Sequence, residues 1–179
     1  MFPQGTLLFV SDFDFSTIDG SLSRLNNFRD KYILVLDNYG SDSSILCCFT
    51  TTLSKEKEFH EVAEIGCNKD FFKYHVFHFQ PFTRVTDKDH MFPARTFIAG
   101  NKGQIFGFPL QKLIEQYDLK DKIMYRGVLY RQLLFDVLYC LNTSKTLEKD
   151  QREELFDIGN EIYKQIQADE AQESEAAEE

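Results

Sequence analysis

The sequence lacks tryptophan and holds only four prolines and four cysteines among its 179 residues. No apolar run approaches the roughly 20 residues that a membrane-spanning helix needs, so no membrane association is expected. No internal repeat, no Cys-x-x-Cys pair and no regular alternation of strand and helix patterns is found. These absences argue against a repeat protein, a common zinc module and a parallel α/β sheet, and they leave a small globular chain.

The cysteines predict free thiols rather than disulfides. Cys47 and Cys48 are adjacent in an apolar run, and neighbouring strand residues face opposite sides, so these two cannot readily pair. The other two are Cys67 and Cys140. Because no signal peptide is recognised, we expect a cytoplasmic protein whose thiols are reduced and mostly buried.

Negative charge is concentrated at the carboxyl end. The net charge is −9, and residues 127–179 hold 5 Lys and Arg against 13 Asp and Glu, whereas residues 1–126 are close to neutral. The stretch 168–179, ADEAQESEAAEE, predicts a solvated, disordered acidic tail. The composition lacks a strongly basic face, which neither requires nor excludes a nucleic-acid ligand.

Apolar runs before residue 110 predict short strands. They lie at 5–15, 32–36, 45–49, 71–82 and, as two pieces, within 94–108. The runs 32–36 and 45–49 are joined by a short polar turn and predict a hairpin. The polar stretch 16–30 is long enough to suggest a functional loop, and 53–65 reads as a loop with a helical turn.

Beyond Pro109 the hydrophobic period changes from that of strands to that of helices. Helices are predicted from Pro109 to Tyr117, over 128–142 and over 150–167. The last has an apolar stripe at three- and four-residue steps, which is typical of a face packed on the rest of the domain. The order, strands first and helices last, predicts a strongly bent sheet or barrel with helices packed on it.

Three stretches resemble the PemK/MazF-like toxins. GTLLFVSDFDF is similar to the family's opening strand of a glycine, an apolar run and an Asp/Phe/Pro ending. KYILVLDN, followed by ILCCFTTTLS, resembles an Arg-Pro-apolar strand that ends in Asn and a next strand that ends in threonine. DLKDKIMYRGVLYRQLLFDVLYCL resembles the closing basic turn and terminal helix. Order and spacing agree across residues 5–142.

The resemblance implies an α+β fold that is mainly β, with a small SH3-like antiparallel barrel followed by C-terminal helices. Residues 1–145 would form the barrel with its packed helix, 146–167 an additional helix, and 168–179 the acidic tail. The stretch 54–93 and the last helix exceed the family's minimal barrel.

The resemblance also implies metal-independent cleavage of single-stranded RNA by a toxin-type endoribonuclease without a cofactor. Carried over, the family's catalytic threonine matches Thr50 and its arginine matches Lys31. Lysine keeps the charge but loses the planar fork that grips phosphate at two points. Arg29 lies two residues earlier on the same side, and Arg24, Arg29 and Thr51 are predicted substrate contacts.

The partners that the resemblance implies are a cognate antitoxin protein and, as a possibility, a second copy of the chain. An alternative remains open, in which the barrel is catalytically inactive and binds RNA or protein. The helix over 150–167 could serve such binding, although its apolar stripe fits packing on its own domain.

Two other site readings are weaker. Cys67, His75, His78 and His90 include zinc ligand types, but His75 and His78 are three apart in a predicted strand and so face opposite sides. No metal is therefore predicted.

The carboxylates Asp12, Asp14 and Asp19 suggest a metal-dependent phosphatase. Such an enzyme needs a larger parallel sheet than this chain provides, which leaves them as carboxylates at the rim of the domain.

Overall fold

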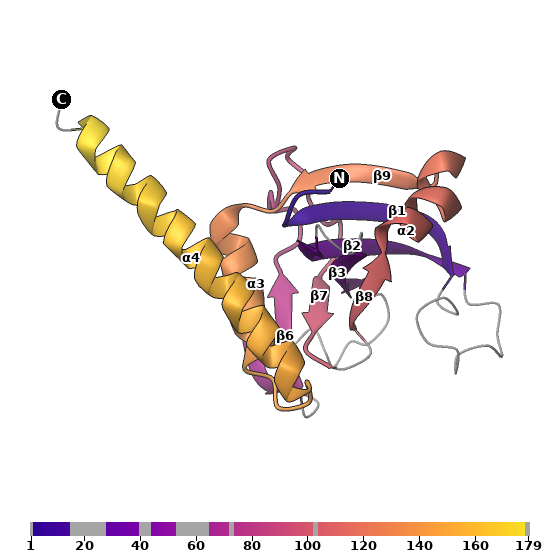
Figure 1. Ribbon diagram of the computed structural model, residues 1–179, viewed down its shortest axis with the longest axis horizontal. Helices are drawn as coiled ribbons and strands as arrows, with labels where there is room; N and C mark the ends of the chain where they lie inside the picture. Colours follow the sequence, from indigo (N-terminus) through magenta and orange to yellow (C-terminus); the bar gives the residue numbers. More distant parts are fainter. Residues whose placement is uncertain are drawn as a thin grey trace.

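The computed structural model describes residues 2–14, 28–39, 44–52, 65–71, 74–101 and 104–177 (Figure 1). The predicted loop over 16–30 lies outside these ranges up to residue 27, and the predicted loop over 53–65 lies outside them up to residue 64. Residues 28–30 are already strand, so the first predicted loop ends earlier than expected, and the remainder of both loop predictions is not tested.

The described strands form two antiparallel sheets. The strands are β1 (Thr6–Asp14), β2 (Phe28–Tyr39), β3 (Ser44–Phe49), β4 (Thr51–Thr52), β5 (Gly66–Phe71), β6 (Tyr74–Phe79), β7 (Thr96–Ala99), β8 (Ile105–Pro109) and β9 (Ile123–Val128). One sheet has the order β8-β3-β2-β1-β9 and the other the order β4-β7-β6-β5. The chain crosses from the first sheet to the second at Thr50. The described strands do not close into a barrel, but the predicted α+β class, mainly β and antiparallel, is confirmed.

The helices follow most of the strands, as predicted. They are α2 (Leu110–Gln116), the 3₁₀ helix η3 (Asp118–Lys120), α3 (Arg131–Asn142) and α4 (Lys149–Ala177). Pro109 is the N-cap of α2, where its missing N–H costs nothing. The predicted start of the second helix at 128 was too early, because Val128 ends β9 and pairs with Thr6 of β1.

Helix α4 extends through most of the predicted acidic tail. It continues to Ala177, so residues 168–177 are helical and the prediction of disorder there is corrected. Alanine, glutamate and glutamine are good helix formers, and extending an existing helix avoids the cost of nucleation. The far end of α4 projects away from the sheets (Figure 1).

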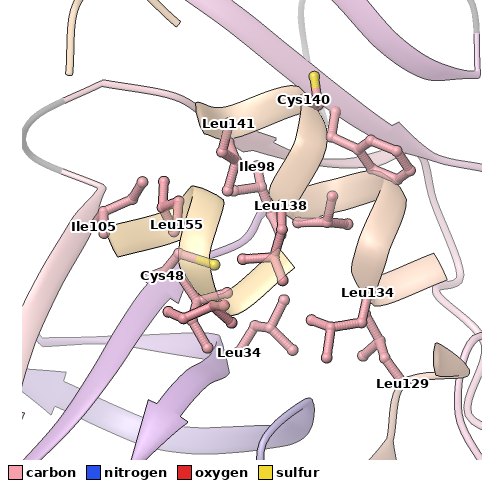
Figure 2. Close-up of a cluster of buried hydrophobic side chains, with 14 of the residues drawn as sticks. Leu34, Cys48, Ile98, Ile105, Leu129, Leu134, Leu138, Cys140, Leu141 and Leu155 are labelled. Atoms are coloured by element: carbon pink, nitrogen blue, oxygen red, sulfur yellow. The ribbon is translucent and has the colours of Figure 1, made fainter. Parts of the chain in front are cut away.

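The first sheet is buried on both faces. One face packs on α3 and α4, and Figure 2 shows Leu34 and Cys48 of the sheet against Leu138 of α3 and Leu155 of α4. The other face lies under α2, with Val10 among its buried residues. A sheet covered on both sides explains why β1 and β2 read as continuous apolar runs rather than alternating ones.

Two of the four cysteines are paired, which corrects the prediction of free thiols. A disulfide joins Cys67 of β5 to Cys140 of α3 across 73 residues of sequence. Cys47 and Cys48 are free and buried, and burial raises the pKa of both thiols. No described helix is both long and apolar enough to cross a membrane.

Candidate functional site

The start of β2 and the end of β3 meet, and this places Lys31 and Thr50 at neighbouring positions. Ile33 pairs with Phe49 across the two antiparallel strands. One step further, the backbone N–H of Thr50 donates to the carbonyl of Tyr32 at 3.1 Å. Thr50 therefore lies across from Tyr32, the residue that follows Lys31.

The side chains of Lys31 and Thr50 leave the sheet on opposite faces. Tyr32 packs against the core that contains α3 and α4, whereas Ile33 belongs to the core under α2. Because strand residues alternate, Lys31 shares the face of Ile33, and Thr50 shares the face of Tyr32. The backbone joins the two predicted residues, but their side chains do not converge on one face.

Lys31 lies beside Arg29 on its own face. Lys31 is half-buried and Arg29 is exposed. Burial lowers the pKa of Lys31, and the charge of Arg29 lowers it further. A phosphate group beside the two cations would offset their mutual repulsion, so this pair suits an anion.

Thr50 is almost fully buried, with 3% of its surface exposed, and its hydroxyl has no hydrogen-bond partner among the described residues. A buried polar atom without a partner is uncommon and calls for an explanation. The backbone of Thr51 pairs with Phe97 in the second sheet. Arg24 lies outside the described residues, so its predicted role is not tested.

Tyr32 is surrounded by side chains that no sequence motif connects. Its ring lies 5.1 Å from that of Phe9, 5.2 Å from that of His90 and 5.2 Å from that of Phe92, measured between ring centroids. The guanidinium carbon of Arg126 lies 5.5 Å from the centre of the Phe9 ring. We call Phe9, Tyr32, His90, Phe92 and Arg126 the Tyr32 cluster.

The chain before His90 is fastened to β9. The hydroxyl of Thr86 donates to the carbonyl of Arg126 at 2.8 Å and accepts from the backbone N–H of His90 at 3.1 Å. The carboxylate of Asp87 accepts from the backbone N–H of Val128 at 2.8 Å. Gly127 makes this close approach possible, since its φ is +105° and a Cβ there would lie 2.5 Å from the Asp87 carboxylate.

The two ionisable members of the Tyr32 cluster are electrostatically linked. Burial lowers the pKa of His90, and the charge of Arg126 lowers it further. Nε2 of His90 and Nε of Arg126 are buried atoms without a hydrogen-bond partner in the described structure. In the sequence, His90 fits only a metal-ligand pattern and Arg126 belongs to a basic turn, so no spacing signal connects them.

The other sequence candidates have structural partners. Within the described ranges no three His, Cys, Asp or Glu side chains come together as a metal site would require. Nδ1 of His75 lies 2.9 Å from the hydroxyl of Thr143. Asp12 forms an ion pair with Lys122 at 3.1 Å, which fits its expected place at the rim.

A hollow of about 240 Å³ lies between α3 and α4, away from the predicted residues. It is mostly apolar and carries no titratable cation or carboxylate, so it does not suit phosphate chemistry. Its lining consists of aromatic, amide and glycine residues: Phe135, Tyr139, Asn142, Phe156, Gly159, Asn160 and Tyr163.

The comparisons with known proteins add no relative to these observations. No family model matches the chain, and neither a curated protein nor a solved structure matches it. The likeness to PemK/MazF-like toxins rests on the sequence stretches alone and stays a prediction.

Proposed function

We propose that the chain is a toxin-type endoribonuclease that cleaves single-stranded RNA without a metal at the start of β2. The observation that carries the proposal is the pair of cations, Arg29 and Lys31, on one face of β2 close to Thr50, the residue that follows β3. Charged donors placed where a phosphate would lie stabilise the charge that builds up on it during cleavage.

The reaction is an intramolecular transfer. The 2′-oxygen of a ribose attacks the neighbouring phosphorus while its proton passes to a base. The bond from phosphorus to the 5′-oxygen breaks, its electron pair stays on that oxygen, and the oxygen takes up a proton. The products are a 2′,3′-cyclic phosphate and a 5′-hydroxyl. Lys31 and Arg29 would hold the phosphate oxygens, and the Thr50 hydroxyl, which leaves the opposite face of the sheet, would contact a neighbouring part of the RNA.

The proposal includes a cytoplasmic location, a homodimer and a cognate antitoxin protein. An antitoxin would block cleavage by covering the cations at the start of β2. Purified chain with and without a candidate antitoxin, compared by sedimentation and by RNA cleavage, tests these partners.

RNA cleavage in EDTA, followed on gels, tests the activity. Lys31→Arg should keep or raise the rate, and Lys31→Ala should lower it about a hundredfold or more, the usual cost of losing one transition-state contact. Lys122→Ala is the matched control, because Lys122 is a partly exposed lysine held in an ion pair with Asp12. Equal rates for all of these proteins would reject Lys31 as a catalytic residue.

A valine substitution tests the role of the Thr50 hydroxyl. Thr50→Val keeps the shape of the side chain and removes a hydroxyl that has no described partner, so it should leave stability unchanged while it lowers cleavage. Unchanged cleavage in Thr50→Val would exclude the hydroxyl from the reaction.

The second candidate function is a catalytically inactive module that binds RNA. The placement of Lys31 and Thr50 on opposite faces of the sheet favours it, because they do not grip one phosphate together. RNA binding without cleavage by the wild-type chain, over a broad set of RNAs, would establish this alternative.

A further inference from the structure

We propose that His90 and Arg126 form a second phosphate-binding subsite, which takes a backbone phosphate of single-stranded RNA on the Tyr32 face of the sheet. This assignment rests on the proposed function only for the identity of the ligand. The site itself is argued from the geometry of the Tyr32 cluster.

Among the described residues, Arg126 is a cation without an acidic partner. It is half-buried, and it forms no ion pair with any carboxylate of the described residues, whereas nearby Arg84 is exposed and paired with Asp89 at 3.2 Å. Its guanidinium instead lies over Phe9 and places Nη2 3.6 Å from the sulfur of Met124. A partly desolvated guanidinium normally has an acidic partner, and a phosphate would supply one.

His90 is held next to this cation by a fixed backbone. The backbone N–H of His90 donates to the Thr86 hydroxyl, and its backbone carbonyl accepts from the N–H of Val85 at 2.9 Å. Its ring rests against Tyr32 and against the fully buried Phe92, with 5.2 Å between centroids in each case. The imidazole therefore cannot retreat from Arg126 without breaking these contacts, so the two groups are placed in advance for a shared ligand.

The charges around His90 come from several elements. β9 contributes Arg126, and β2 contributes the neutral Tyr32. On its own loop, Asp89 pairs with Arg84, Asp87 caps β9, and Lys88 lies 4.5 Å from the centre of the Tyr125 ring. The charge that acts on His90 most directly is thus positive, and an anion bound there would reverse its effect.

Thr50 adds a third polar group to the same face. It lies across from Tyr32, and its buried hydroxyl lacks a described partner. Nε2 of His90, Nε of Arg126 and the hydroxyl of Thr50 are thus three buried polar atoms that have no hydrogen-bond partner among the described residues. A ligand that reached them would recover hydrogen bonds that the free protein forgoes.

Nuclear magnetic resonance of labelled histidine tests the subsite, with the His90 signal assigned from His90→Gln. The probe is a single-stranded 2′-O-methyl RNA oligonucleotide, which carries phosphates but cannot be cleaved by attack of a 2′-hydroxyl. Its binding should raise the pKa of His90, because a neighbouring anion favours the imidazolium. In the free protein, Arg126→Gln should also raise this pKa, because it removes a positive neighbour.

Affinity measurements complete the test. Arg126→Gln should weaken oligonucleotide binding about tenfold, and Arg126→Lys should restore part of it. Arg84→Gln is the matched control, because Arg84 is an exposed arginine in the segment that carries His90 and already forms an ion pair with Asp89. This variant should bind the oligonucleotide like the wild type.

The subsite is overturned if saturating oligonucleotide leaves the His90 signal unmoved, or if Arg126→Gln and Arg84→Gln bind equally well. A response to inorganic phosphate with none to the oligonucleotide overturns the assignment to RNA. If the wild type cleaves no RNA but His90 still responds to the oligonucleotide, the proposed function fails and the subsite stands. Cleavage without a response of His90 removes the subsite alone.

Discussion

A single step along β2 separates two chemical environments. Lys31 lies with Arg29 on the face under α2, while Tyr32 lies with His90, Phe92 and the cation of Arg126 on the face under α3. Because side chains alternate along a strand, neighbouring residues can serve different chemistry without any rearrangement of the backbone. Each face thus presents its own cations at the same end of the sheet.

The pKa of His90 predicts a pH dependence of stability. Burial and then Arg126 disfavour the imidazolium, so the pKa of the folded state lies below the ordinary 6.5. Between these two values the unfolded chain binds more protons than the folded one. The contribution of His90 to the free energy of unfolding is therefore complete above 6.5, and it is lost as the pH falls through the folded pKa.

Urea unfolding from about pH 7 to about pH 5 measures this effect. The wild type should lose more stability over this range than His90→Gln, which has no titrating ring at this position. Arg126→Gln should lie between them, because it removes only the smaller cause of the shift. Identical pH profiles for the wild type and His90→Gln would contradict the prediction.

Helix α4 has two parts with different roles. Leu155, Ile158 and Ile162 are buried in the main core, whereas the last turns are exposed and acidic. Among the described residues, the end of the helix is fastened by an ion pair between Arg131 of α3 and Asp169, both largely exposed. We therefore expect the first part of α4 to supply most of the helix's contribution to the free energy of unfolding.

Truncation after Gln167 tests this division. It should lower the free energy of unfolding by less than about 1 kcal/mol, since exposed ion pairs contribute little. Ile162→Ala should cost about 2–5 kcal/mol, as is usual for a large side chain removed from a packed core. Chemical denaturation of the two variants measures both changes. A truncation as costly as Ile162→Ala would show that the acidic turns also support the fold.

Across the whole molecule, the disulfide links parts that are distant in the chain. Cys67 lies in the second sheet, and Cys140 lies in the helix that packs between both sheets and α4. Closing a loop of 73 residues restricts the unfolded chain and so stabilises the folded one, in the chain-entropy account by about 4 kcal/mol.

Reduction should therefore lower the melting temperature without abolishing the fold, because the hydrophobic core does not depend on the bond. Cys67→Ser is the suitable variant, since Cys67 is exposed and the change buries no new hydroxyl. It should match the reduced wild type, and reducing agent should not affect it further. An oxidised wild type that melts at the same temperature as Cys67→Ser would show that the disulfide does not stabilise the protein.

The sequence by itself determined the order of the elements and the class of the fold. Hydrophobic periods and turn residues are local signals, so they located β1, the β2–β3 hairpin, the two short strands β7 and β8, and the helices after Pro109. They also placed Lys31 near the end of β3, although β2 begins three residues before Lys31, at Phe28. Local signals were less exact at the ends of elements. Val128 ends β9 instead of starting a helix, and α4 continues through the acidic segment to Ala177.

Only the tertiary structure decided which side chains share a place. The Cys67–Cys140 bond depends on how α3 packs on β5 and β6, and no spacing in the chain encodes it. The side chains of Lys31 and Thr50 are separated because the two faces of β2 pack against different cores, one under α3 and α4 and the other under α2. His90 and Arg126 come together because Thr86 and Asp87 fasten one segment to another some 40 residues later. Contacts between distant segments depend on packing and on buried hydrogen bonds, which leave no periodic pattern in the sequence.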